Sequence, residues 1–164
     1  MSVKIFLDMD GTLFDLYNKP GWLDDLENEN PGAFKEYGAN HGLMPFIQRD
    51  SLQQTILNMI DRGFTFGIIS WLPRGASPEY SEICRAEKLE WLKENLPMIE
   101  EISLIPYGIE KQKAIQKRAS RMYLIDDNAE ILNAWATQKQ RFAYLVDEDY
   151  SVIDALNDIL EIES

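Results

Sequence analysis

The sequence KIFLDMDGTLFD, residues 4–15, places two aspartates, Asp8 and Asp10, directly after a short apolar run. Residues 4–7 are typical of a buried β-strand, which is short, apolar and bounded by polar residues. A carboxylate at the end of such a strand loses part of its hydration, and this loss costs free energy unless the charge is paired. The stretch therefore indicates that the two carboxylates hold a ligand or a cation at the end of the first strand.

The composition is that of an ordinary globular protein. The chain has 164 residues, of which 45% are hydrophobic and 27% charged, enough for one sizeable core. No apolar run approaches the ~18 residues of a membrane span, so we expect no membrane association. The formal net charge of -12 repels nucleic acid, so we expect no nucleic-acid polymer as a partner.

Two rare residues, Cys84 and His41, narrow the chemistry. A single cysteine cannot form an internal disulfide, and the N-terminus does not resemble a secretion signal, so we expect the protein in the cytoplasm. Cys84 lies among apolar residues and is expected to be a packed thiol. His41 is the only histidine, which argues against a histidine-based metal site, and we expect it in an exposed loop.

Strand and helix patterns alternate along the chain. Apolar runs predict strands at 4–7, 64–70, 102–105, 122–125 and 142–146. Amphipathic spacing and capping residues predict helices at 50–62, 78–95, 110–119, from 129 and at 152–162, with Asp50, Ser77 and Asn128 as N-caps. This alternation predicts an α/β fold of three layers, with a parallel sheet of about five strands between helices on both faces.

Residues 14–49 interrupt the alternation. They consist of short polar and aromatic pieces separated by prolines and glycines, which are typical of turns. We interpret them as a small, partly helical cap insertion after the first strand, so that the core domain comprises residues 1–13 and 50–164. Three aromatic residues are expected to form a small core of the insertion itself: Trp22, Tyr37 and Phe46.

Polar side chains gather at the ends of three predicted strands. Asp8 and Asp10 follow the first strand, Ser70 ends the second, and Asp126 and Asp127 follow the fourth. Ligands of parallel sheets bind outside the carboxyl ends of the strands, so these groups are expected to meet. Converging carboxylates repel one another unless a cation neutralises them. Oxygen ligands of this kind suit Mg²⁺, and the four aspartates form the expected metal site.

Four pieces of the sequence resemble the motifs of the haloacid dehalogenase (HAD) superfamily, in that family's order: DMDGTL at 8–13, Ser70, a lysine near 111 and LIDD at 124–127. The resemblance implies a HAD-like Rossmannoid fold with Mg²⁺ as cofactor. It implies that Asp8 is the nucleophile, forming an aspartyl-phosphate, and that Asp10 is the general acid and base, with its backbone carbonyl helping to bind the metal. The chemistry agrees, because a carboxylate that attacks phosphorus needs the phosphoryl charge neutralised.

The expected phosphate-binding groups surround the same edge. Gly11 lets the backbone approach a phosphate closely, and Thr12 offers further donors. Ser70 keeps a hydroxyl where the HAD motif more often has threonine. Lys111 and Lys113 are both candidates for the motif lysine; we favour Lys111, which lies nearer the loop IPYG, and expect Lys113 to be solvated.

A narrower resemblance is to the 5'(3')-deoxyribonucleotidase family of cytosolic type C 5'-nucleotidases. It rests on DMDGTLFDL, AEKLEWLKENLP at 86–97, IPYGIEK at 105–111, and LIDDN with Trp135 following. It implies that Lys88 contacts the phosphate region, that Leu16 and Trp71 line the nucleoside pocket, and that Trp71 also lies beside the phosphate. Independently, Lys88 shares one helical stripe with apolar residues, so it either extends to solvent or meets an anion.

These patterns lead to one main hypothesis and two alternatives. We expect a Mg²⁺-dependent phosphomonoesterase that acts on (deoxy)nucleoside monophosphates. The alternatives are a HAD phosphatase for a sugar phosphate or other small metabolite, and a non-catalytic binding module on the same fold, against which the intact aspartates argue. The short insertion leaves the site open, so the protein would either admit bulky substrates or use a partner subunit as a lid, as in a homodimer.

Overall fold

The structure of the protein, a computed structural model, describes residues 1–40 and 42–164, so the expectation for His41 lies outside the described residues. The strands are β1 (Val3–Leu7), β2 (Thr65–Trp71), β3 (Glu101–Ile105), β4 (Arg121–Asp126) and β5 (Arg141–Leu145). The helices are α1 (Trp22–Glu27), α2 (Lys35–Asn40), α3 (Arg49–Asp61), α4 (Pro78–Asn95), α5 (Ala129–Trp135), α6 (Val152–Glu163) and the 3₁₀ turn η1 (Lys111–Ala114). Of the helices in these ranges, none has both the length and the apolar character that crossing a bilayer requires.

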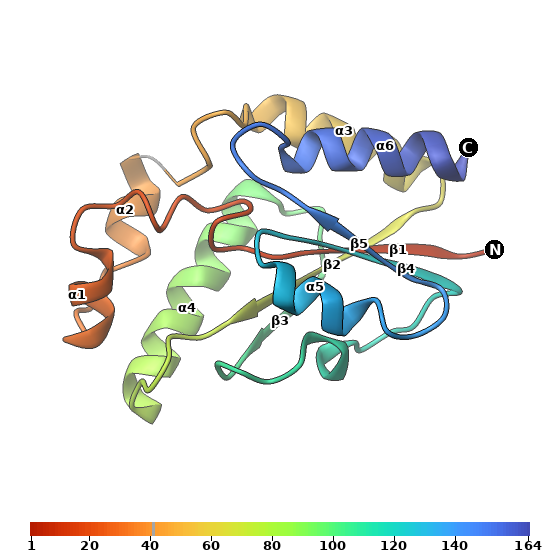
Figure 1. Ribbon diagram of the computed structural model, residues 1–164. Coiled ribbons are helices and arrows are strands. Elements are labelled where there is room, and N and C mark those ends of the chain that lie inside the picture. The colour runs from red at the N-terminus through yellow and green to blue at the C-terminus, as the bar shows by residue number, and fades with distance from the viewer. Residues whose placement is uncertain (41) are drawn as a thin grey trace.

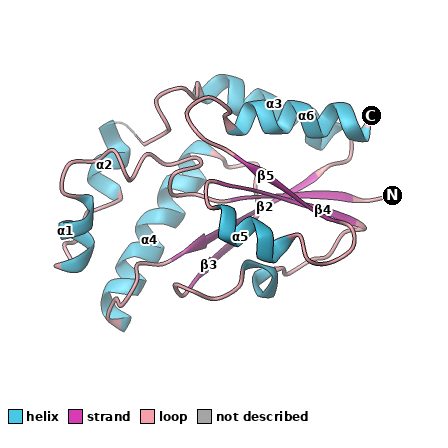
Figure 2. Cartoon of the chain, in the orientation of Figure 1, coloured by secondary structure: helices cyan, strands magenta, loops and turns pink. Residues whose placement is uncertain are grey.

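All five strands run parallel, in the order β3-β2-β1-β4-β5. The chain builds β2 and β3 on one side of β1 and then crosses to the other side for β4 and β5, so the strand order reverses at β1. Helices lie on both faces of the sheet (Figures 1 and 2). The predicted α/β fold is confirmed, and a reversal of strand order creates a crevice beside the carboxyl end of β1.

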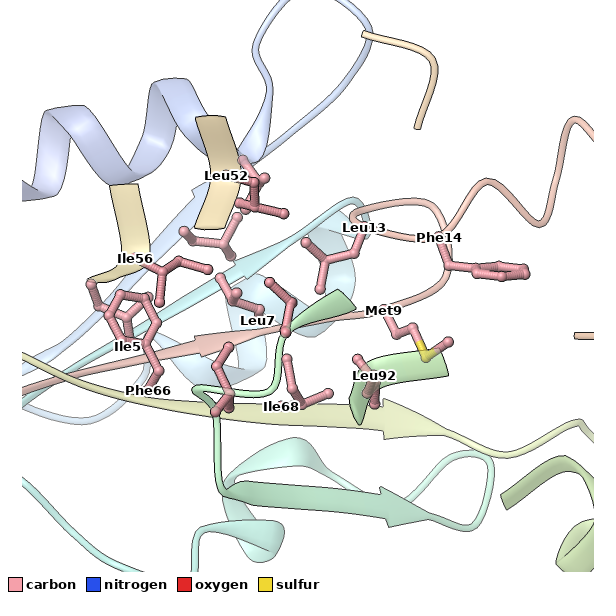
Figure 3. Packing of buried hydrophobic residues seen from close by; sticks show 14 of the residues in the cluster. Ile5, Leu7, Met9, Leu13, Phe14, Leu52, Ile56, Phe66, Ile68 and Leu92 are labelled. Carbon is pink, nitrogen blue, oxygen red and sulfur yellow. The ribbon is translucent and has the colours of Figure 1, made fainter. Parts of the chain in front are cut away.

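Alternation along β1 divides the core between the two faces of the sheet. Ile5 and Leu7 belong to a cluster that includes residues of α3, α4 and α6, whereas Phe6 belongs to a second cluster that includes residues of α5. Figure 3 shows Ile5 and Leu7 among apolar side chains of β2 and α3. A strand covered on both faces exposes none of its side chains, and all five residues of β1 are buried. The apolar run in the sequence therefore marks the centre of the sheet.

Two of the expected helix N-caps are present. Ser77 accepts a backbone N–H at the start of α4, and Asn128 accepts two at the start of α5. The prediction for Asp50 is wrong, because α3 begins one residue earlier, at Arg49. Asp50 lies instead in the first turn, where a negative charge stabilises the helix dipole.

The helix predicted at 110–119 is wrong beyond its first turn. Only η1 is helical, and the chain is extended again at Ile115. The reason lies in Ser103 of β3, whose hydroxyl donates to the carbonyl of Ala114 at 3.1 Å and accepts the side-chain amide of Gln116 at 3.0 Å. The carbonyl that would continue the helix is therefore bonded to the sheet.

The segment between β1 and α3 folds into α1 and α2 with connecting turns and lies beside α4 (Figure 1). The carboxylate of Glu87 on α4 accepts three backbone N–H groups of this segment, from Gly32, Phe34 and Lys35, at 2.9, 3.0 and 2.7 Å. Glu29 of the segment accepts the hydroxyl of Ser77 at 2.6 Å, at the start of α4. The segment is therefore held against the core by charge-assisted hydrogen bonds.

The aromatic residues of the segment do not form the separate core that the sequence suggested. Phe14 and Phe34 belong to the main cluster, and the ring of Tyr37 meets Phe14 edge-on at 6.0 Å. Phe46 is 42% exposed. Trp22 packs instead against Tyr17, at a ring distance of 4.9 Å. The segment thus extends the main core, and its description as a cap insertion stays a prediction.

Candidate active site

Strand ends bring the predicted carboxylates to one edge of the sheet. Asp8 follows β1 directly, Asp126 is the last residue of β4, and Asp127 comes next. The register pairs Leu7 with Ile125, so β1 and β4 end side by side. Ligand oxygens of the three aspartates all lie within 4.8 Å of one another. The backbone pairing of the parallel sheet therefore brings together the residues that carry these carboxylates.

Lys111 lies between two of these carboxylates. Its Nζ donates to Asp8 Oδ1 at 2.8 Å and to Asp126 Oδ2 at 2.7 Å, and the side chain is 2% exposed. Burial lowers the pKa of Lys111, but Asp8 and Asp126 raise it by more, so the ammonium stays charged. Lys113 is exposed and lies 4.0 Å from Glu110. Of the two candidate lysines, the structure brings Lys111 into the site.

The acidic cluster carries more negative charge than Lys111 compensates. Burial and the neighbouring Asp8 raise the pKa of Asp126 to about 6, even though Lys111 lowers it. Burial and the carboxylates of Asp8 and Asp126 raise the pKa of Asp127 to about 9. Oxygen ligands under mutual repulsion are what a hard divalent cation neutralises. Asp8, Asp126 and Asp127 therefore fit a Mg²⁺ ion.

The carboxylate of Asp10 lies apart from this cluster and is held by Lys88. The Lys88 ammonium is fully buried and donates to Asp10 Oδ2 at 2.7 Å, to Ser70 Oγ at 3.1 Å and to the carbonyl of Trp71 at 2.8 Å. The ammonium also lies 4.8 Å from the ring centre of Phe34. The lysine on the apolar stripe of α4 therefore meets an anion rather than solvent, and that anion is a side chain of the site.

Burial and Lys88 act in opposite directions on the pKa of Asp10. Burial raises the pKa of Asp10, and Lys88 only partly offsets this effect. Among the described residues, no group forms a hydrogen bond with the buried Asp10 Oδ1. Asp10 nevertheless lines the cavity in front of Asp8. A carboxyl group that holds a proton at the edge of a cavity can donate it to a bound ligand.

The chain turns at Gly11, directly after Asp8 and Asp10, and this turn requires glycine. Gly11 has a φ of 83°, and a Cβ on it would lie 2.2 Å from Asp127 Oδ2 and 2.8 Å from the ring of Tyr17. A side chain at this position would displace a carboxylate of the cluster. Thr12 is buried and donates its hydroxyl to Asp8 Oδ2 at 3.1 Å. The structure thus directs Thr12 to Asp8, the predicted nucleophile.

A cavity of about 920 Å³ opens in front of the aspartates. One wall carries Trp71 and Tyr107, whose ring centres lie 4.8 Å apart, and the Trp71 Nε1–H donates to the carbonyl of Ile109 at 2.7 Å. The guanidinium of Arg74 lies 5.8 Å from the Tyr107 ring centre. The segment after β1 contributes further lining residues: Leu16, Tyr17, Trp22, Leu23 and Leu26. The lining of the cavity therefore combines the acidic groups with aromatic and aliphatic side chains.

Several residues of this site were not predicted from the sequence. Tyr17, Arg74 and Tyr107 line the cavity, and each lies in a loop that follows the carboxyl end of a strand. Such loops line the ligand sites of parallel sheets, so position alone could have indicated them. The sequence signal for Glu87 was weaker. Glu87 lies three residues after Cys84, which puts it near the buried stripe of α4.

Comparison with known proteins identifies the fold. No family model matches the sequence, and no curated protein matches it. The structure is similar to the HAD domain of the effector protein Lem4 from Legionella pneumophila, with a TM-score of 0.51 and 15% identity over 98% of this chain and 95% of that one. It is also similar to D,D-heptose 1,7-bisphosphate phosphatase from Burkholderia thailandensis, with a TM-score of 0.50 and 9% identity over 98% and 99%. The fold is HAD-like.

The HAD-like fold agrees with the motif order read from the sequence. In this fold the pieces DMDGTL, Ser70, Lys111 and LIDD occupy the end of β1, the end of β2, η1 and the end of β4. β2 runs one residue further than predicted, so Ser70 precedes Trp71 within the strand. The neighbours show the fold alone. Membership of the HAD superfamily and the narrower nucleotidase resemblance stay predictions.

Proposed function

We propose that the protein is a Mg²⁺-dependent phosphomonoesterase that works through an aspartyl-phosphate on Asp8. The observation that carries this proposal is the buried ammonium of Lys111 between Asp8 and Asp126, with Asp127 alongside. Asp8, Asp126 and Asp127 would hold the metal, with the Asp10 backbone carbonyl as a further ligand. When bound, Mg²⁺ would neutralise charge on the phosphoryl oxygens.

The side chains supply the remaining steps. An oxygen of Asp8 attacks phosphorus, the bond from phosphorus to the ester oxygen breaks, and Asp10 gives its proton to that oxygen. Lys111 and the hydroxyl of Ser70 stabilise charge on the phosphoryl group. Asp10, now ionised beside Lys88, then takes a proton from the water that hydrolyses the aspartyl-phosphate. Asp8 and the protonated Asp10 are regenerated and inorganic phosphate is released, so atoms and charges balance.

We propose nucleoside monophosphates as the substrates. The support is the aromatic lining of the cavity, in which Trp71 lies beside Ser70 and its indole is fixed by the bond to Ile109. The cavity volume of about 920 Å³ falls in the usual range for sites that bind small molecules such as a nucleoside monophosphate. Leu16 and Trp71 would contact the nucleoside, and Gly11 and Ser70 would lie beside the phosphate. Thr12 and Lys88 would act on the phosphate through Asp8 and Asp10, to which they donate. The free, buried Cys84 agrees with a reducing compartment such as the cytoplasm, and a homodimer that closes the cavity stays a prediction.

A panel of phosphomonoesters tests this function. Nucleoside 5'- and 3'-monophosphates, sugar phosphates and para-nitrophenyl phosphate would be assayed by phosphate release, with Mg²⁺ and with EDTA. We expect turnover only with metal, highest for a nucleotide, and a loss of several orders of magnitude in Asp8→Asn. Asp24→Asn, an exposed carboxylate of α1, is the matched control and should keep full activity. A preference for sugar phosphates would overturn the nucleotide assignment, and activity in Asp8→Asn would overturn the mechanism.

A further inference from the structure

The edge of the sheet formed by the amino ends of the strands contains a buried arginine, Arg141, which has no acidic partner among the described residues. Arg141 is the first residue of β5 and pairs with Met122 near the start of β4. Asp126 lies four residues further along β4, a separation of roughly 13 Å at about 3.3 Å per residue. Arg141 is therefore outside the catalytic cavity, and it does not line it.

Arg141 and Trp135 place two buried donors next to each other. Arg141 is 6% exposed and Trp135 is 0% exposed. The guanidinium carbon lies 5.3 Å from the centre of the Trp135 ring. Neither the Arg141 Nη1 nor the Trp135 Nε1 finds a hydrogen-bond acceptor within the described residues. Buried donors are nearly always bonded, so these two neighbouring donors require an acceptor that the described residues do not provide.

A neighbouring arginine shows what is missing. Arg121, at the start of β4, also lies over an aromatic ring, 4.4 Å from the centre of Phe142. Its Nε donates to Glu163 at 2.6 Å, so the charge is neutralised. Arg141 lies over the ring of Trp135, but among the described residues no carboxylate pairs with it. A cation buried in this way costs free energy unless an anion accompanies it.

The surroundings of Arg141 are positively charged. Residues 111–125 and 131–146 contain no aspartate or glutamate, although the whole chain has a formal net charge of -12. Burial lowers the pKa of Arg141, and the nearby charge of Arg118 lowers it further. Arg118 is exposed, in the loop before β4. Both the missing acceptor and the local charge therefore call for a negatively charged ligand.

We propose that Arg141, Trp135 and Arg118 form a binding site for a small oxyanion, a phosphate, a sulfate or the phosphoryl group of a small ester. One oxygen of the anion accepts hydrogen bonds from Arg141 Nη1 and Trp135 Nε1, and the charge of Arg118 attracts it. Because both donors are enclosed, the ligand must be compact, and the turn before β5 must move aside to admit it. That turn includes Gln140, which holds a left-handed φ of 62°. The site does not depend on the catalytic function proposed above.

The four tryptophans of the chain give separate reporters for the two sites. In a ¹⁵N spectrum of the metal-free protein, the indole N–H signal of Trp135 would be assigned with Trp135→Phe. Sodium phosphate, sodium sulfate and glycerol phosphate would each be titrated at constant ionic strength against chloride. We expect the Trp135 signal to shift and saturate with phosphate and sulfate, with glycerol phosphate showing whether an ester is also admitted. The Trp71 signal reports the catalytic cavity in the same spectra.

Three variants decide the assignment. Arg141→Met should weaken the affinity read from Trp135 about ten-fold to one-hundred-fold, as loss of a charged hydrogen bond does. Arg118→Gln should weaken it about two- to five-fold, and Arg49→Gln, an exposed arginine of α3, should leave it unchanged. If Arg141→Met does not fold, Arg141→Lys replaces it and should still weaken binding. A Trp135 signal that stays fixed, fails to saturate, or saturates equally in Arg141→Met overturns the proposal; absence of phosphatase activity leaves it standing.

Discussion

The carboxyl edge of the sheet and the segment that faces it are positioned in different ways. Asp8 and Asp126 stand at strand ends, so the pairing of β1 with β4 fixes them whatever their side chains contact. The described residues of the segment at 14–49 contribute no strand to the sheet, and Glu87 of α4 and its N-cap Ser77 hold the segment. Catalytic residues that backbone pairing positions can be predicted from the sequence. A segment that side-chain contacts position depends on partners far along the chain.

Among the substitutions that test this comparison, we expect the largest effect at Lys111, which contacts the carboxylates at both strand ends. Lys111→Met keeps much of the apolar stem and removes the charge between Asp8 and Asp126. We expect turnover to fall about 10²–10⁴-fold, since the developing phosphoryl charge loses a fixed cation. Phosphate release under saturating substrate measures it. Lys113→Met, two residues away and exposed, is the matched control, and equal losses in both variants would mean that Lys111 has no special place in the site.

The second effect concerns the segment, through Glu87→Gln. An amide at this position keeps one acceptor but turns an N–H group toward backbone N–H donors that the carboxylate accepted. We expect the free energy of unfolding to fall by about 1.5–3 kcal/mol and proteolysis within 14–49 to become faster. Denaturant unfolding and limited digestion measure these changes. Glu90→Gln on the exposed face of the same helix should do neither. Protection of the segment in Glu87→Gln would show that the contacts of Glu87 are not what holds it.

The same distinction explains what the sequence predicted. The strands, their parallel arrangement and the convergence of Asp8, Asp126 and Asp127 follow from hydrophobic periodicity and from the rule for strand ends. The carboxylate of Glu87 accepts three backbone N–H groups from residues 32–35, which lie about fifty positions away in the sequence. No local sequence pattern predicts this contact. The helix predicted at 110–119 failed for the same reason, because Ser103 takes a carbonyl from it.

The third effect concerns recognition of the substrate by the cavity lining. Trp71→Ala removes the indole at the end of β2 and leaves the lining residues of the segment after β1 unchanged. For a nucleotide we expect kcat/KM to fall about ten-fold to one-hundred-fold, because stacking of a base contributes ~1–3 kcal/mol. Hydrolysis of para-nitrophenyl phosphate should change little, since that ester reaches little of the cavity. Equal losses on both substrates would indicate a disturbed site, and no loss on either would favour a phosphatase that does not recognise a base.

The smallest effect concerns charge at the sheet edge, and it appears in the stability of the metal-free protein. The pKa values of Asp126 and Asp127 are raised to about 6 and about 9, above the ~3.9 of an unfolded chain. Between pH 4 and pH 9 the folded state therefore binds more protons than the unfolded state. The free energy of unfolding is highest below pH 4 and falls as the pH rises through 6 and toward 9.

Asp127→Asn removes part of this proton uptake, so between pH 5 and pH 8 it should lose less unfolding free energy than the unmodified protein. We expect a difference of about 1–2 kcal/mol, because one pKa unit corresponds to ~1.4 kcal/mol and solvent screens part of the repulsion. Denaturant unfolding in EDTA at the two pH values measures it, with Asp24→Asn as the control that keeps the slope. Mg²⁺ should flatten the slope of the unmodified protein, since the cation takes the place of the protons. A slope that is the same in both proteins, with and without Mg²⁺, would mean that the carboxylates at the strand ends are placed together without the repulsion that calls for a metal.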